Sequence, residues 1–328
     1  MAKNVTMRDV AERAGVSIAT VSHVVNKTRH VNQERRDVVL NVIEELGYMA
    51  SNSLLRKDTS RLIGLIIADI REDFYTEIVK AAETTACENG YSLILCDAQD
   101  DEQKELFYIR MLQQQNVQGI ILAPIIHAAT PSILKEADVP VVLIDRCYRE
   151  QQFDFIGINN MAAGREATMH LMRHGARRIG FIGYDDSVYT IQQRILGYLD
   201  AMELSGRQDD EPQVLRLKYH TDRTTGKIAA MVRDNNLDGL VCATSHACYE
   251  SVSALREHQI RVPEDVQIIT FDENKWFDFL SFPLSVVQQP TTEIGTLAVE
   301  FIVNKLRNPS KPRRDPRKLL LDFEIINR

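Results

Sequence analysis

The feature that most constrains this chain is a pair of short helical patterns near its N-terminus, separated by three residues. Thr6 and Asp9 have the spacing of a capping box, which marks the start of a first helix. Gly15 can adopt the left-handed conformation that ends a helix, and Ser17 can cap the next one. Two helices joined by so short a turn predict a helix-turn-helix unit.

The second helix of this unit, expected over Ile18–Val25, has two unlike faces. At about 100° per residue its valines fall together, which predicts a side that packs on the other helices. A third helix, capped by Asn32 and ending at Gly47, adds apolar residues to the same small core. The valine side consists of Val21, Val24 and Val25, the opposite side of Ile18, Ala19, Ser22 and His23, and the inner face of the third helix of Val39, Val42, Ile43 and Leu46.

From residue 62 onward, short apolar runs rich in β-branched residues alternate with amphipathic helical stretches, for example Tyr75–Asn89 and Gly164–His174. This alternation predicts parallel sheets with helices on both faces. The runs form two sets, which predicts two subdomains. The first set is Leu62–Ala68, Ser92–Asp97, Gly119–Ala123, Val139–Ile144 and Phe155–Ile158, and the second is Arg178–Gly183, Val214–Leu217, Gly239–Ala243, Val266–Asp272, Leu284–Gln288 and Lys318–Phe323.

Charge is distributed unevenly along the chain. The net charge is −7, yet residues 1–60 hold nine basic and seven acidic side chains, which leaves −9 for the remainder. A mildly basic head on an acidic body is typical of a small module that faces an anion. Differences of this size are common, so the charge pattern supports nucleic-acid binding only together with the helix-turn-helix unit.

Several function classes lack their sequence signals. No run approaches the roughly 18 apolar residues that span a bilayer, and the first residues lack the apolar core of a signal peptide, so we expect a cytoplasmic protein. The phosphate-binding GxxxxGK[ST], the GxSxG and the HExxH motifs of enzymes are absent. The histidines show no metal-ligand spacing. We therefore expect neither an enzyme nor a protein with a metal or cofactor.

Motifs spread over essentially the whole chain resemble the LacI family of bacterial repressors. They begin within the helix-turn-helix unit and continue into both predicted subdomains. The head carries Thr6-Met7-Arg8-Asp9-Val10-Ala11, Ala14-Gly15-Val16-Ser17, Thr20-Val21-Ser22 and Val25-Asn26. The body carries Ile63-Gly64-Leu65-Ile66, Ile144-Asp145-Arg146, His174-Gly175-Ala176-Arg177-Arg178-Ile179, Arg194-Ile195-Leu196-Gly197-Tyr198 and Thr270-Phe271-Asp272.

The resemblance implies a regulator of carbohydrate-utilisation genes that binds a near-palindromic DNA operator as a homodimer. It implies an all-α head over residues 1–48, a hinge over 49–60, and a body over 61–328 for effector binding and dimerisation. The body would resemble a periplasmic sugar-binding protein, with two doubly wound α/β subdomains joined by three crossovers. A sugar, sugar phosphate or sugar acid in the cleft between them would control DNA binding. An enzyme of sugar metabolism and a periplasmic sugar receptor are the rival interpretations.

The resemblance also assigns DNA-contacting residues in the head. Ile18, Ala19 and His23 stand where the family contacts bases; the alternative is that the two apolar residues only pack. A leucine of the hinge enters the minor groove in the family, but this hinge has Ala50-Ser51 in place of Pro-Asn and is two residues short, so Leu54 and Leu55 compete for that role. Leu55 is our assignment. Contacts to phosphates are expected from Thr6, Ser17, Thr20, Asn26 and His30, each of which can instead be a cap or a surface residue.

In the body, the resemblance places Asp145, Arg146, Arg194 and Asp272 at the effector cleft. Carboxylates accept hydrogen bonds from vicinal hydroxyls, and guanidinium groups bind anionic oxygens in pairs. The alternative is that these four form structural ion pairs. Arg146 beside Asp145 favours an anionic effector slightly. Further candidates are Phe74 and Tyr75 at the cleft mouth, Thr244 and Ser245, and Trp276, which can stack on a sugar or belong to the core.

Overall fold

The computed structural model describes residues 5–26, 29, 31–46, 61–125, 130–136, 139–148, 152–184, 188–206, 211–218, 224–308 and 316–327. The expectations for His30, for Leu54 and Leu55 and for the hinge at 49–60 lie outside these residues, as does the side chain of Asn26.

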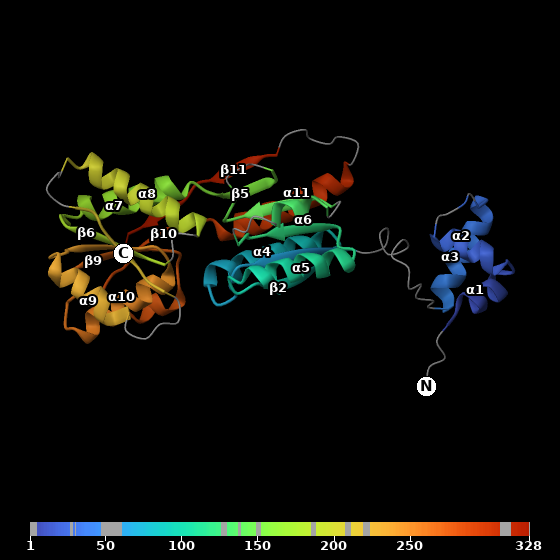
Figure 1. Ribbon diagram of the computed structural model, residues 1–328, viewed down its shortest axis with the longest axis horizontal. Coiled ribbons are helices and arrows are strands. Elements are labelled where there is room, and N and C mark those ends of the chain that lie inside the picture. Colours follow the sequence, from blue (N-terminus) through green and yellow to red (C-terminus); the bar gives the residue numbers. More distant parts are fainter. Residues whose placement is uncertain are drawn as a thin grey trace.

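The N-terminal region folds into three helices, α1 (Met7–Ala14), α2 (Ile18–Asn26) and α3 (Gln33–Leu46) (Figure 1). The predicted caps are confirmed. Thr6 and Asp9 form a reciprocal capping box, and Gly15 ends α1 with a left-handed φ of 66°. The amide nitrogen of Thr20 donates to Ser17 Oγ at 3.1 Å, and that of Glu34 to Asn32 Oδ1 at 3.1 Å. Local hydrogen bonding therefore fixes where each helix begins.

The apolar faces of the three helices meet in a core of their own. Each helix is too short to be stable alone, so its stability depends on this shared packing. The buried members are Val10, Ala11, Val21, Val24, Val25, Val39 and Val42, and Ile43 and Leu46 pack against them. The predicted inner faces of the second and third helices are thus confirmed.

The first subdomain is built on a six-stranded parallel sheet in the order β11-β5-β4-β3-β1-β2. Helix α11 packs against α4, and α11 also contacts three strands of the sheet. The strands are β1 (Leu62–Ile67), β2 (Ser92–Asp97), β3 (Gly119–Leu122), β4 (Val141–Ile144), β5 (Asp154–Ile158) and β11 (Lys318–Leu321), and the helices are α4 (Asp73–Glu88), α5 (Glu102–Gln114), α6 (Thr130–Lys135) and α11 (Thr291–Arg307).

The second subdomain repeats this plan in the order β12-β10-β9-β8-β6-β7, with β12 antiparallel to β10. Helices α7 and α8 pack closely together, as do α9 and α10. The strands are β6 (Ile179–Gly183), β7 (Gln213–Arg216), β8 (Gly239–Cys242), β9 (Gln267–Phe271), β10 (Ser285–Gln288) and β12 (Glu324–Ile326). The helices are α7 (Asn160–Arg173), α8 (Tyr189–Leu204), α9 (Thr224–Asp234), α10 (Ser245–Glu257) and the 3-10 helix η1 (Lys275–Phe279).

The chain passes between the two subdomains three times, as expected: after β5, after β10 and between β11 and β12. Figure 1 shows the consequence, since red C-terminal segments lie among the green and teal elements of the first subdomain. One strand assignment was wrong. The run Lys318–Leu321 pairs with β5 in the first sheet, and only the following strand, β12, joins the second. Both runs are short and apolar, so their pattern does not say which sheet they complete.

Two glycines allow α7 and α8 to touch through their backbones. A methyl group on Gly164 would collide with the backbone of Arg194, and one on Gly197 would collide with the carbonyl oxygen of Met161. The glycines therefore fix how close α8, which carries Arg194, can lie to α7.

Among the residues described, no helix is both long enough and apolar enough to cross a bilayer.

Candidate functional site

The outward face of α2 has the composition of a surface that meets another molecule. Ile18 is 48% exposed although it is a large aliphatic residue, and Ala19 beside it is also exposed. His23 is half-buried on the same face. The opposite side holds the buried valines, so the core accounts for the apolar residues of that side but not for the exposed Ile18.

The hydroxyl groups near α2 differ in whether a hydroxyl proton remains for a hydrogen bond to another molecule. Thr6 Oγ1 donates to Asp9 at 2.6 Å, so its proton is used within the cap. Ser17 Oγ and Thr20 Oγ1 lie 2.8 Å apart, and one of them donates to the other. One hydroxyl proton of that pair remains for an acceptor such as a phosphate oxygen.

A cleft lies where the strands of both sheets end. Residues that follow β1, β2 and β4 approach it from the first subdomain, and residues that follow β8, β9 and β10 approach it from the second, together with the first turns of α4 and α8. Open α/β sheets bind ligands at this edge. Its lining consists of Asp69, Glu72, Phe74, Tyr75, Asp100, Asp145, Arg146, Val188, Thr190, Ile191, Arg194, Thr244, Asp272 and Gln289.

Asp145 and Asp272 hold equivalent places in the two subdomains. Each directly follows a buried strand, β4 or β9, and each has a left-handed backbone, with φ of 60° and 64°. Aspartate tolerates this conformation better than most residues, but the conformation still costs free energy. Both carboxyl groups are buried, and burial raises their pKa values, to about 7 for Asp272.

Arg146 is already held by the first subdomain. Its Nη1 donates to Asp100 at 2.6 Å, and its Nε lies 3.7 Å from Asp145 Oδ2. The other neighbour of Asp145 is Tyr75, whose hydroxyl donates to Oδ2 at 2.8 Å. A guanidinium group between two carboxylates offers little net positive charge to a ligand.

Arg194 is held by three elements of the second subdomain. Its Nε donates to Asn160 Oδ1 at 2.8 Å, and its Nη1 donates to the carbonyl oxygen of Ala243 at 2.6 Å. The guanidinium carbon lies 3.8 Å from the ring centroid of Phe271. Burial lowers its pKa, and the charge of Asp272 opposes that shift. The side chain is thus fixed before any ligand arrives.

Asp272 is oriented from the last crossover. Gln289 Nε2 donates to its two carboxylate oxygens at 2.9 and 3.1 Å. Gln289 follows β10, at the point where the chain leaves the second subdomain. An acceptor of the cleft is therefore tied to a segment that connects its two halves.

A second depression, called here the side pocket, opens next to the cleft and shares Asp69 and Glu72 with it. Two of the predicted effector residues, Ser245 and Trp276, lie here rather than in the cleft. Ser245 Oγ donates to Glu72 Oε2 at 3.2 Å, which links the two subdomains. The lining of the side pocket is Asp69, Arg71, Glu72, Ser245, His246, Tyr249, Asn274 and Trp276.

The structure brings the other seven predicted residues together at the cleft: Phe74, Tyr75, Asp145, Arg146, Arg194, Thr244 and Asp272. Sequence reasoning missed Asp69, Asp100 and Gln289, although each follows a predicted strand. Applying the strand-end rule to every strand would have found them. Glu72 was also missed, because nothing in the sequence shows that the residue capping α4 faces inward.

The cleft carries a negative balance. Among the described lining residues, five carboxyl groups accompany two guanidinium groups. A third guanidinium, that of Arg71, forms two hydrogen bonds through Nε with Asp69, at 2.9 and 3.0 Å. The cleft therefore offers several acceptors for hydroxyl or amino hydrogens. Of its two guanidinium groups, that of Arg146 forms an ion pair with Asp100, whereas the hydrogen bonds of Arg194 go to uncharged acceptors.

Known proteins match this arrangement in both regions. Residues 6–51 match the model of the bacterial regulatory proteins of the lacI family, and residues 168–328 match that of a periplasmic binding protein-like domain. A ribose operon repressor from Halalkalibacterium halodurans is 31% identical over 92% of this chain and 90% of its own. The HTH-type transcriptional repressor PurR of Vibrio atlanticus is 30% identical over 94% of both chains.

A solved structure extends the likeness to the whole architecture. The transcriptional regulator CelR in complex with cellobiose superposes with a TM-score of 0.72 and 26% identity, and the match covers 98% of both chains. The helix-turn-helix head, the two parallel-sheet subdomains and the full-length relatives agree, and the chain belongs to the lacI family of DNA-binding transcriptional regulators.

Proposed function

We propose that the chain acts in the cytoplasm as a homodimeric repressor of carbohydrate-utilisation genes, and that it carries out no catalysis. Two heads bind a near-palindromic operator, and an uncharged carbohydrate in the cleft controls the complex. The observation that carries the effector class is the surplus of carboxyl groups in the cleft, where five carboxyl groups accompany two guanidinium groups among the described lining residues and Arg146 is already paired with Asp100.

For DNA, the support is the division of α2 into a buried valine side and an exposed side. Ile18 and Ala19 can contact thymine methyl groups, and His23 can donate to or accept from a base edge. Ser17 and Thr20, with one hydroxyl proton to share, are placed for a phosphate. Asn26 and His30 are proposed as further phosphate contacts and Leu55 as the minor-groove leucine, on the strength of the family pattern alone.

For the effector, the support is the surplus of acceptors. Asp145 and Asp272 face the cleft from opposite subdomains, and a polyhydroxylated ligand can donate to both at once. A phosphate or carboxylate at Arg146 would have to displace Asp100, and one at Arg194 would compete with the charge of Asp272, which acts on that guanidinium group. Both features favour an uncharged ligand over the anion that the sequence favoured. The ribose operon repressor and the CelR–cellobiose complex fit this class by name, and PurR makes a purine base the alternative.

A ligand screen tests the effector class. The unfolding temperature of the full chain is measured in the presence of matched ligands. They are a neutral sugar, the phosphate ester of that sugar, the corresponding sugar acid, and free purine bases. Neutral sugars are expected to raise the unfolding temperature and to change operator affinity in a band shift. A purine base or a sugar phosphate as the strongest ligand would contradict the assignment, and the absence of any operator complex would contradict the regulator itself.

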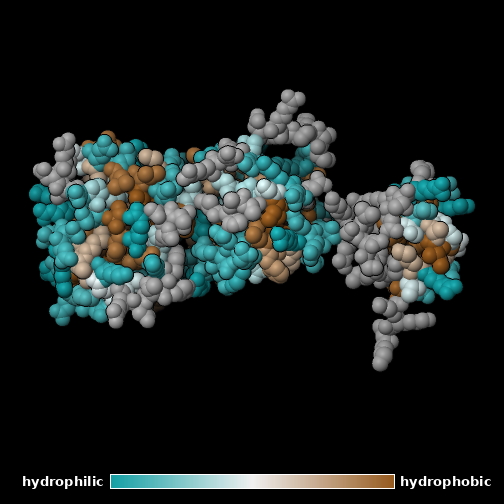
Figure 2. Space-filling view, in the orientation of Figure 1, coloured by the Kyte–Doolittle hydropathy of each residue, from teal (hydrophilic) through white to brown (hydrophobic). Residues whose placement is uncertain are grey.

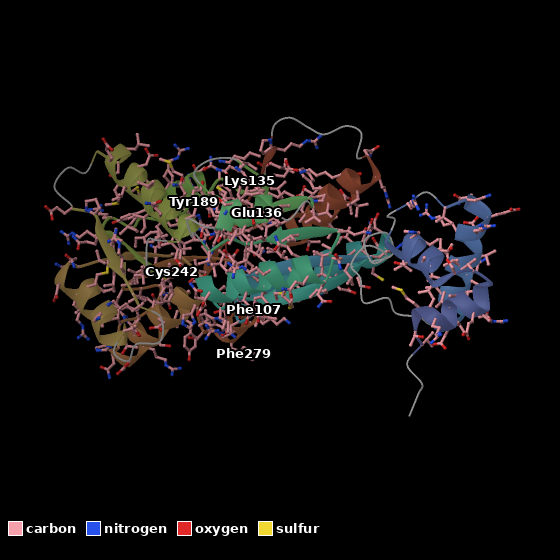
Figure 3. The ribbon with its side chains drawn as sticks, turned by 45° about the vertical axis from the view of Figure 1, so that its right-hand side comes forward. Phe107, Lys135, Glu136, Tyr189, Cys242 and Phe279 are labelled. Atoms are coloured by element: carbon pink, nitrogen blue, oxygen red, sulfur yellow. The ribbon has the colours of Figure 1, made fainter. Side chains whose placement is uncertain are left out.

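For the homodimer, the support is the exposure of large apolar side chains on two elements of the first subdomain. Strand β2 lies at the edge of its sheet and exposes Leu95 at 38%, and α5 exposes Phe107 at 62% (Figure 3). Figure 2 likewise shows hydrophobic patches within the hydrophilic surface of both subdomains. An exposed apolar edge strand can pair with another chain and so promotes aggregation. A second copy of this chain that covers the strand would prevent such pairing.

Light scattering on size-exclusion fractions tests the dimer. Phe107→Glu is expected to shift the chain toward monomer and to weaken operator binding at dilute concentration, because one head holds only half of the phosphate contacts. Lys104→Glu, which changes a charge on the same helix, serves as the control. An unchanged mass for Phe107→Glu would place the interface elsewhere.

A further inference from the structure

We infer that the side pocket is a second carbohydrate subsite and that the effector is an uncharged disaccharide, one unit in the cleft and the other against Trp276 and Tyr249. This inference rests on the proposed function, because it extends the site assigned there. Continuity is the first support. Asp69 and Glu72 line both depressions, so a ligand that leaves the cleft on this side enters the side pocket directly.

The aromatic wall is the second support. Tyr249 is 55% exposed and meets Trp276 edge to face, with ring centroids 5.7 Å apart. His246 stacks on Tyr249 at 6.4 Å and 20°. The exposed ring of Tyr249 and the half-buried ring of Trp276 meet at right angles and form a corner. The apolar faces of sugar rings pack against such surfaces while their hydroxyls reach polar groups.

The Trp276 ring of the wall is held from one side. Trp276 packs edge to face on the buried Phe277, with centroids 4.5 Å apart. Its backbone nitrogen donates to Asn274 Oδ1 at 3.3 Å, which fixes the start of η1. The wall is thus largely preformed, and a ligand that binds it does not have to order it first.

Charge is the third support. Asp69, at the junction, is held by Arg71, and Glu72 by the hydroxyl of Ser245. Burial raises the pKa of Glu72. The two carboxyl groups at the passage between the depressions can accept hydroxyl hydrogens of a glycosidic ligand, and the nearby guanidinium group of Arg71 is already paired with Asp69.

Binding of matched pairs to the full chain tests the subsite: cellobiose against glucose, sucrose against fructose, and maltose against glucose. The disaccharide that binds is expected to bind about tenfold more tightly than its component sugar, the effect of one ring–ring contact. Trp276→Ala and Tyr249→Ala should each lower that affinity to the level of the monosaccharide and leave monosaccharide binding unchanged. Phe279→Ala, which removes a neighbouring ring that is 89% exposed and outside both linings, is the control.

Trp276 is the single tryptophan of the chain, so its fluorescence reports on the subsite without any substitution. A bound disaccharide is expected to protect it from acrylamide quenching, and a bound monosaccharide is not. Equal protection by both, or a monosaccharide that binds as tightly as every disaccharide, would overturn the subsite while leaving the proposed function intact. If neither class binds, the carbohydrate assignment fails as well. If Trp276→Ala does not fold, the disaccharide affinity of Tyr249→Ala and the quenching of wild-type Trp276 fluorescence still test the subsite.

Discussion

At the scale of single residues, the cleft combines two demands that oppose each other. Asp145 and Asp272 are buried, which favours their neutral forms, yet a carboxylate is the better acceptor for a hydroxyl. Neighbouring donors reduce the conflict: Tyr75 for the first and Gln289 for the second. The pKa of Asp272 nevertheless rises to about 7. A ligand that donates to Asp272 supplies the stabilisation that the empty cleft lacks.

Asp272→Asn should therefore stabilise the effector-free protein at high pH. The ordinary pKa of the group is 3.8 and its folded value is about 7, so the folded chain keeps its proton longer than the unfolded chain does. Stability then falls as the pH rises from about 4 to about 7, and the variant lacks this decline. We expect a higher unfolding temperature for the variant at pH 8 and no difference near pH 4, measured by calorimetry.

Asp265→Asn is the matched control of opposite sign. Its hydrogen bonds from Arg261 hold the pKa of the exposed Asp265 at about 2. The Asp265 carboxyl group adds stability only above its folded pKa. The variant should therefore be as stable as the wild type at very low pH and slightly less stable at pH 8. A loss of stability for Asp272→Asn at every pH would show that the contacts of the Asp272 side chain stabilise the fold by more than its buried charge destabilises it.

His23→Ala tests base readout on α2. If His23 contacts a base edge, its removal should relax the preference at one symmetric position of each half-site and cost about 1–3 kcal/mol there. Ser17→Ala should instead weaken binding to all sequences alike, because phosphate contacts do not distinguish bases. Operator selection from a randomised library, followed by sequencing, compares the two. An unchanged preferred sequence for His23→Ala would mean that another face reads the DNA.

At the scale of elements, the contact between α7 and α8 positions the cleft arginine. Because Gly164 and Gly197 lack side chains, the backbones of α7 and α8 come into direct contact at these positions. Arg194 bonds Asn160 at the start of α7, so the helix spacing and the guanidinium position depend on each other. The two glycines thus act on the effector site although neither lines it.

Gly197→Ala should weaken both stability and effector binding. The added methyl group collides with the carbonyl oxygen of Met161, which cannot move without displacing α7. We expect a cost of about 2 kcal/mol in unfolding free energy, typical of an overpacked contact. Effector affinity should fall in calorimetry while operator affinity stays unchanged. Gly226→Ala in α9, where an added methyl group meets nothing within 4 Å, is the control. Equal behaviour of the two variants would contradict this account.

Sequence reasoning succeeded where local chemistry decides the structure. The caps at Thr6, Ser17 and Asn32 depend on side chains within three residues, and the strand-end position of Asp145 follows from one apolar run. It failed where distant segments decide. The sheet that Lys318–Leu321 joins is determined by the path of the whole chain through both subdomains. The position of Trp276 in the side pocket depends on how η1 packs beside α10.

At the scale of the whole molecule, the chain combines a module for DNA with a two-part receptor. The receptor halves meet at the cleft through contacts such as that of Ser245 with Glu72. A ligand shifts the arrangement of the halves only through a difference in affinity between two arrangements. Residues from both halves line the cleft, so a ligand that contacts both favours the arrangement that brings them together.

Operator binding should depend steeply on salt. With about 6–10 phosphate contacts in a dimer, affinity is expected to drop by about 10³–10⁵ between 50 and 200 mM salt. Fluorescence anisotropy with a labelled operator measures the slope, and Phe107→Glu, which we expect to be monomeric, should show about half of it. Binding that is insensitive to salt would contradict DNA recognition by the head.

The three passages between the subdomains also determine the order in which a ribosome can complete them. The first subdomain begins with β1 at residue 62, yet its sheet lacks β11 until residue 321 has been made. Helix α11, whose Gly295 lies against the backbone of α4, is likewise added near the end of synthesis. During most of translation the apolar side of α4 therefore has no helix to cover it, and this half of the nascent chain is the one that most needs protection from aggregation.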